Sequence, residues 1–229
     1  MNAQPTVIVF ALFPGVTQLD FTGPHAVFSR LPGAQVLVAS RTGEPIEADG
    51  ITFAGLRRLA DIPRCDVICV PGGFGATDNA IGDEEFLREL RRLAASARYI
   101  TSVCTGSLVL GAAGLLRGKP AACHWAWRDF LTSFGAVPDT ARVVRDGNVI
   151  TGGGVTAGID LALTVAAEAF DEDLARSIQL SIEYDPHPPF DAGSPERADA
   201  ALVEQTRAAA SKRQSERQAA VDRAAARLR

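Results

Sequence analysis

The 229-residue chain lacks long hydrophobic runs, since no apolar segment approaches the roughly 20 residues that span a bilayer. Its first five residues, MNAQP, carry no basic group and lead directly into an apolar segment, so we expect no signal peptide. The sequence holds only four cysteines, without the paired spacing of a small disulfide-stapled domain, which favours reduced thiols. These absences argue against an integral membrane protein and a disulfide scaffold, and they favour a cytoplasmic location.

Charge is distributed unevenly along the chain. The whole sequence carries 23 Lys and Arg against 27 Asp and Glu, a net charge of −4. Residues 197–229 hold eight basic and four acidic residues, so this tail is +4 and residues 1–196 carry −8. An acidic body disfavours nucleic-acid binding, and we expect no nucleic-acid or membrane partner. The tail is rich in Ala and Arg, which predicts a solvated helix that packs on the body or on a partner subunit.

Composition and periodicity predict one α/β domain. The chain is 47% hydrophobic and 22% charged, as expected for a globular protein that can bury a full core. Near-continuous apolar segments, typical of strands covered on both faces, alternate with helix-like segments. This alternation predicts a doubly wound parallel sheet within residues 1–196, and the proline-rich loop at 184–196 marks the boundary to the tail. Strands are predicted at 6–13, 35–40, 66–73 and 98–104, helices at 23–31, 83–97 and 156–170, and a hairpin at 142–151.

The segment YITSVCTGSLVLGAAG, residues 99–114, passes from β-forming to small helix-forming residues without a polar spacer. A side chain at such a tight strand-to-helix junction is pushed out above the sheet, which is the geometry of a nucleophile elbow. Cys104 occupies this junction. Backbone N–H groups at the start of the helix would stabilise its thiolate, and the Thr105 amide would point at negative charge that develops on a substrate. Cys104 is therefore the candidate nucleophile.

Two other strand ends carry residues suited to the same crevice, because ligands of open α/β sheets bind beyond the carboxyl ends of the strands. After the first strand, FPGVTQLDFTGP places Asp20 in a loop above the sheet. There it is either an acid–base group facing the thiol or a cap of the following helix. After the third strand, Gly72 and Gly73 either present backbone N–H groups to a ligand or form a simple turn. The convergence of these strand ends with Cys104 predicts an active site.

The other cysteines and a nearby histidine favour structural roles. Cys65 and Cys69 are spaced to face one side of a strand and, with no further ligand nearby, indicate core packing and no metal site. Cys123 and His124 begin a predicted helix. A dyad of Cys104 and His124 is conceivable, but a structural histidine is the favoured interpretation. The aromatic side chains that follow are expected to pack rather than bind a ligand: Trp125, Trp127 and Phe130.

Taken together, these motifs resemble the ThiJ/PfpI superfamily. The similar segments are FPGVTQLDFTGP, DVICVPGG, residues 99–116, HWAW and GNVITGGGVTAGID, and the resemblance extends over residues 6–225. It implies a flavodoxin-like fold with a cysteine elbow, a homodimer, and a reaction that needs no metal or cofactor. Within the superfamily, the isocyanide hydratases are most similar. This resemblance implies Cys104 as the nucleophile, Asp20 as the acid–base carboxylate and Thr105 as a supporting neighbour.

Isocyanide hydration is chemistry that these residue types can perform. An isocyanide, R–N≡C, has a terminal carbon that a thiolate can attack, and the nitrogen gains basicity as the S–C bond forms. A carboxylic acid beside the thiol can then supply a proton. Water attacks the resulting thioimidate while the ionised carboxylate removes its proton, and an N-substituted formamide leaves. One nucleophile and one carboxylate suffice.

Departures from other members of the superfamily narrow the range of activities that we expect for this protein. Peptidase-like members carry a histidine directly after the cysteine, and glyoxalase-like members carry a glutamate near the end of the first strand. Here these places hold Thr105 and Asp20. The 33 residues after Glu196 are too few for the helix-turn-helix domain of the superfamily's regulators. Two alternatives stay open: glyoxalase- or deglycase-like chemistry on small dicarbonyls, and a redox sensor in which Cys104 is oxidised to a sulfinate.

Overall fold

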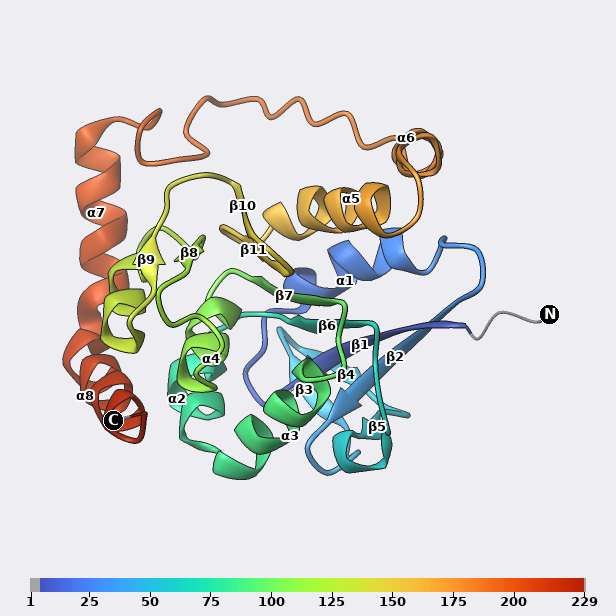
Figure 1. Ribbon diagram of the computed structural model, residues 1–229. Coiled ribbons are helices and arrows are strands. Elements are labelled where there is room, and N and C mark those ends of the chain that lie inside the picture. Colours follow the sequence, from blue (N-terminus) through green and yellow to red (C-terminus); the bar gives the residue numbers. More distant parts are fainter. Residues whose placement is uncertain (1–4, 229) are drawn as a thin grey trace.

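The computed structural model describes residues 5–228, which fold around a central seven-stranded sheet in the order β10-β11-β7-β6-β1-β2-β5 (Figure 1). All neighbouring strands run parallel except β10 and β11, which form the antiparallel hairpin that closes one edge. The predicted doubly wound α/β fold is confirmed. The strands are β1 (Thr6–Leu12), β2 (Ala34–Ser40), β5 (Arg57–Arg58), β6 (Val67–Val70), β7 (Tyr99–Val103), β10 (Val143–Asp146) and β11 (Val149–Gly152).

Helices cover both faces of the sheet, so the central strands are buried on both sides (Figure 1). On one face lie α1 (Gln18–Phe28) and α5 (Ala157–Ala169), which pack closely where the Pro24 ring rests against Gly158. On the other face lie α3 (Glu84–Ala94) and α4 (Gly106–Ala112). Asp83 is the N-cap of α3, and its side chain accepts a hydrogen bond from the Phe86 N–H at 3.0 Å. The core therefore lies in two layers, above and below the parallel strands.

Helix α1 begins five residues earlier than the sequence predicts, at Gln18 instead of residue 23. Gly23-Pro24 resembles a helix start, because proline is favoured in the first turn, yet here Pro24 lies inside the helix. Asp20, expected in a loop, therefore lies in the first turn of α1. The N-cap position belongs to Thr17, so the interpretation of Asp20 as a helix cap is wrong.

Other differences between the sequence predictions and the structure concern short or polar elements. Cys65 precedes β6 and is not part of it, so the shared strand face with Cys69 is wrong, although both side chains are buried. The helix predicted from residue 124 is a 3₁₀ segment, η3 (Arg128–Phe134). The following elements were not predicted: β3 (Ile46–Ala48), β4 (Ile51–Phe53), η1 (Leu59–Asp61), α2 (Gly75–Asp78), η2 (Ala80–Gly82), β8 (Pro120–Ala121), β9 (Val137–Pro138) and α6 (Glu172–Ser181).

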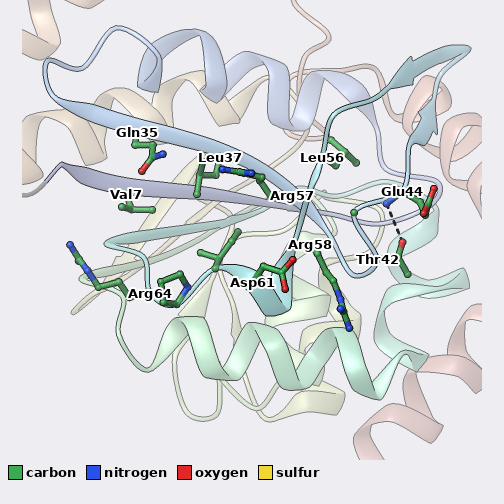
Figure 2. Close-up of a pocket in the computed structure, with 13 residues that line it drawn as sticks. Val7, Gln35, Leu37, Thr42, Glu44, Leu56, Arg57, Arg58, Asp61 and Arg64 are labelled. Carbon is green, nitrogen blue, oxygen red and sulfur yellow. Dashed lines mark hydrogen bonds between the residues drawn. The ribbon is translucent and has the colours of Figure 1, made fainter.

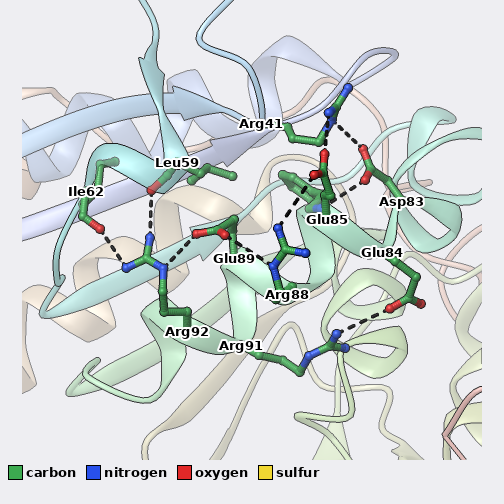
Figure 3. Close-up of polar contacts among 11 residues, drawn as sticks. Arg41, Leu59, Ile62, Asp83, Glu84, Glu85, Arg88, Glu89, Arg91 and Arg92 are labelled. Carbon is green, nitrogen blue, oxygen red and sulfur yellow. Dashed lines mark hydrogen bonds and ion pairs between the residues drawn. The ribbon is translucent and has the colours of Figure 1, made fainter.

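Arginines and carboxylates crowd the β2–β5 edge of the sheet. A cavity of about 610 Å³ opens there, and Figure 2 shows Arg57, Arg58 and Asp61 in its wall. Next to it, Arg92 of α3 donates hydrogen bonds to the carbonyls of Leu59 and Ile62, at 2.8 and 2.9 Å (Figure 3). These bonds fasten the segment between β5 and β6 to α3. None of the predicted site residues lines this cavity.

The tail forms α7 (Ala200–Ala210), η4 (Ser211–Arg213) and α8 (Gln214–Ala226). Helix α8 packs against α2, η2 and η3 and buries Val221 and Ala224 completely or nearly so. A salt bridge of 2.8 Å between Arg213 and Asp78 also ties the tail to the rest of the chain. Division of the chain at residue 196 remains a prediction. No helix in residues 5–228 is both long enough and apolar enough to cross a membrane.

Candidate active site

Cys104 lies at the junction between β7 and α4 with a left-handed backbone, φ +59°. Non-glycine residues rarely adopt this conformation, which costs about 1–3 kcal/mol and is concentrated at functional sites. Two carbonyls at the end of β11 hold the backbone in place, because the Cys104 N–H donates to Gly152 at 3.0 Å and to Gly153 at 2.7 Å. The predicted cysteine elbow is therefore present, and its backbone is fixed by the neighbouring strand.

Gly72 brings Asp20 and Thr105 together. Its N–H donates to Oδ2 of Asp20 at 2.8 Å. A Cβ at this glycine would lie 2.5 Å from the Thr105 nitrogen and 2.7 Å from Asp20 Oδ2, so no larger residue fits without displacing them. The Thr105 hydroxyl accepts from the Gly73 N–H and donates to the Gly73 carbonyl, both at 2.9 Å. The two N–H groups expected to face a ligand are thus engaged by side chains, and they position Asp20 and Thr105 instead.

Asp20 is completely buried, and Oδ1 has no hydrogen-bond partner among the described residues. Burial raises the pKa of Asp20 to about 7, against the smaller opposing effects of the Gly72 N–H and the Cys104 thiol. A carboxyl with this pKa holds its proton in about half of the molecules near neutral pH. Asp20 can therefore donate or accept a proton at ordinary cellular pH.

Burial also raises the pKa of the Cys104 thiol well above its ordinary value, and the negative charge of Asp20 raises it further. The N–H groups of Thr105 and Val155 lower it, but they do not outweigh burial. The expected stabilisation of the thiolate by backbone N–H groups is therefore present, but burial has the larger effect on the thiol pKa. Because ionised Asp20 and a thiolate repel each other, loss of the thiol proton is favoured when Asp20 carries a proton.

A cavity of about 190 Å³ opens at Cys104, smaller than the sites that bind drug-sized molecules. Trp125 and Trp127 line it, and Trp127 also packs on Phe130, so their expected packing role stays a prediction. Sequence reasoning also missed three lining residues from the tail, because no local motif marks them. The lining residues are Thr17, Gly73, Phe74, Thr77, Cys104, Thr105, His124, Trp125, Ala126, Trp127, Val155, Thr206, Ala210 and Arg217.

His124 lies in the wall of this cavity, where Nδ1 accepts a hydrogen bond from the Ala126 N–H at 3.3 Å. Burial and the nearby Arg128 lower the pKa of His124, which keeps the ring neutral. No hydrogen bond between His124 and Cys104 is present among the described side chains. In the same part of the chain, no group of three or more His, Cys, Asp or Glu side chains could hold a metal ion.

The sequence and the fold match those of one protein family. The sequence profile of the DJ-1/PfpI family matches residues 6–168, and the chain belongs to this family. It is 50% identical over 222 residues to the isonitrile hydratase of Pseudomonas putida, covering 96% of this chain and 97% of that protein. The crystal structure of a ThiJ/PfpI family protein from Pseudomonas syringae has a TM-score of 0.88 at 42% identity, covering 96% of this chain and 90% of that one. Drosophila melanogaster DJ-1beta shares the fold, with a TM-score of 0.70 at 24% identity over 78% of this chain and 98% of that one.

The electrostatic effect of Asp20 on the Cys104 thiol can be tested through cysteine alkylation. Limiting iodoacetamide should modify Cys104 before Cys65, Cys69 or Cys123, because only Cys104 lines the active-site cavity. In Asp20→Asn, the alkylation profile should shift to lower pH, because the carboxylate that raises the thiol pKa is gone. Peptide mass spectrometry across a pH series measures both. Equal labelling of Cys123, or a profile that stays in place, would contradict this description of the site.

Proposed function

We propose that this protein is an isocyanide hydratase, which adds water to R–N≡C and releases an N-substituted formamide. One observation carries the proposal: a fully buried carboxyl, Asp20, held by Gly72 beside the thiol of an elbow cysteine, Cys104. This arrangement supplies a nucleophile and a proton carrier with a pKa near neutrality. The 50% identity with an isonitrile hydratase over almost the whole chain supports the same activity.

In the first half of the reaction, Sγ of Cys104 attacks the terminal isocyanide carbon and forms the C–S bond. The thiol proton passes to the Asp20 carboxylate as sulfur attacks, which removes the repulsion between the two groups. Asp20 then returns this proton to the adduct. The product is a neutral thioimidate, R–N=CH–S–Cys, which carries its added hydrogen on the former isocyanide carbon. The N–H groups of Thr105 and Val155 stabilise negative charge on sulfur during the attack.

In the second half, water adds to the thioimidate carbon. Asp20, again ionised, removes a proton from the water, and the nitrogen gains one. Collapse of this tetrahedral adduct breaks the C–S bond, releases R–NH–CHO and restores the thiol. Every proton that moves passes between substrate, water, Cys104 and Asp20, so the scheme calls for neither a metal nor a cofactor.

Thr105 has a positioning role in this scheme. Its hydroxyl is held on both sides by the Gly73 backbone, at 2.9 Å each. That fixes the Thr105 N–H next to the sulfur, and it also fixes Gly73, which follows the glycine that holds Asp20. A histidine at this position, as in the peptidase-like members, would add a second base, but Asp20 already fills that role.

Two variants test the roles of the pair. Cys104→Ala should abolish formamide release, because it removes the bond-forming atom. Asp20→Asn should lose about 10²–10⁴-fold in turnover, because an amide neither donates an acidic proton nor accepts one from water. Gas chromatography of formamide release from an alkyl isocyanide measures both variants.

Melting temperatures control for folding, and methylglyoxal serves as a second substrate for all three proteins. Near-parental turnover by a stably folded Asp20→Asn would remove Asp20 from the chemistry. Turnover of methylglyoxal but not of the isocyanide would favour the glyoxalase-like alternative.

We also propose a cytoplasmic homodimer. A basic tail on an acidic body supports docking onto a second copy, and α7 buries none of its residues within a single chain. Light scattering at micromolar concentration should therefore give twice the 24.2 kDa mass of one chain. A monomer mass at that concentration would contradict the dimer.

A further inference from the structure

Arg217 of α8 places a buried cation in the wall of the active-site cavity. Its side chain is only 6% exposed, and it lines the same cavity as Cys104. The guanidinium lies over two aromatic rings, 4.8 Å from the centroid of Phe74 and 4.5 Å from that of Trp127. Contacts with two rings hold the planar group in one orientation. The position of this charge is therefore fixed before any ligand arrives.

Only some of the hydrogen-bond donors of this guanidinium have a partner within the described part of the protein. Nη1 donates to the Ala210 carbonyl at 3.2 Å, whereas Nε is buried and has no partner in the described part of the chain. Two acids, Asp78 and Glu216, act electrostatically on Arg217, but both form salt bridges with Arg213, at 2.8 Å each. Arg217 itself forms no ion pair with a described carboxylate. A buried cation without a counter-ion is costly. Its retention in the wall of the cavity that holds Cys104 indicates that a ligand supplies a partner for the guanidinium.

Size and polarity define that ligand. The cavity holds about 190 Å³, enough for a short molecule with one end at Cys104 and the other at Arg217. The remaining wall is mostly aromatic or small, and His124, which burial and Arg128 keep neutral, adds no positive charge. Arg217 is thus the charged group available to bind the end of the ligand distant from sulfur, and it suits an anion with two acceptor oxygens.

We propose that the preferred substrate is an isocyanide whose N-substituent bears a carboxylate, and that Arg217 binds this carboxylate while the isocyanide carbon lies at Cys104. The proposal rests on the hydratase function proposed above and adds a substrate class to it. Asp20 contacts the Cys104 thiol, at the opposite end of the ligand from Arg217, so the bound carboxylate would not lie against the ionised acid–base group.

Two isocyanides of nearly equal shape test this substrate class. Isocyanoacetate carries a carboxylate where 2-methylpropyl isocyanide carries an isopropyl group. The parent protein should show a higher kcat/KM for isocyanoacetate. Arg217→Met should lower that value by about 10- to 100-fold while changing turnover of the neutral isostere much less, since a hydrogen bond to a charged group is lost only with the anion. Arg217→Lys should recover part of the preference.

Arg223→Met is the matched control, because Arg223 is an exposed arginine on the same helix. It should leave the ratio of the two kcat/KM values unchanged. If Arg217 only anchors the tail, Arg217→Met should lower both values together, and the ratio would not move. That result, or a parent protein with no preference for the anion, would overturn the proposal.

Binding of the products separates this proposal from the hydratase function. N-formylglycine and N-(2-methylpropyl)formamide are the formamides expected from the two substrates, and calorimetry measures their binding without turnover. Arg217-dependent binding of N-formylglycine in a protein that hydrates neither isocyanide would support the carboxylate site and overturn the hydratase. Hydration of the neutral isocyanide without Arg217-dependent binding of N-formylglycine would overturn the site alone.

Discussion

The close approach of Asp20 to the Cys104 elbow is the constraint on which the rest of the site depends. It exists because residue 72 has no side chain: a Cβ there would overlap both Asp20 Oδ2 and the Thr105 nitrogen. Ionised Asp20 is costly in this position. A pKa of about 7, against an ordinary 3.8, corresponds to a loss of roughly 4 kcal/mol in the free energy of unfolding once the group is ionised. That loss is absent below about pH 4 and grows as the pH rises towards 7, so the fold gives up stability to keep a proton carrier beside the thiol.

Chemistry and recognition come from different parts of the chain. The ends of β1, β6, β7 and β11 place the nucleophile, the acid and the backbone groups that hold them. The far wall of the cavity comes from α7 and α8, which Arg213 ties to Asp78 at 2.8 Å. A protein built in this way can keep the same reaction at the ends of its strands while changes in its C-terminal helices alter the charge and size of the pocket. In the proposed scheme, the family fold therefore positions Cys104 and Asp20, and the tail selects the substrate through Arg217.

The sequence predicts the cysteine elbow well because it is local: the strand, Cys104 and the helix follow one another directly along the chain. It predicts strands such as β1 and β6 well for the same reason, since each is a mostly apolar run. Asp20 was identified but misplaced, because Gly23-Pro24 has the pattern of a helix start although α1 begins at Gln18. The raised pKa of the thiol and the role of Arg217 could not be predicted. Both depend on which distant segments bury a group, and no local pattern records that burial.

The central claim is that Asp20 exchanges a proton near neutral pH because it is buried beside the thiol. The most direct test is carbon NMR of protein labelled at the aspartate carboxyl carbons, titrated with pH, with Asp20→Asn to assign the resonance. Here Asp20 should titrate near pH 7. In Cys104→Ala the midpoint should rise, because the thiol contact that lowers the pKa of Asp20 is removed. Titration near pH 4, as for an exposed carboxyl, would contradict this account of the site.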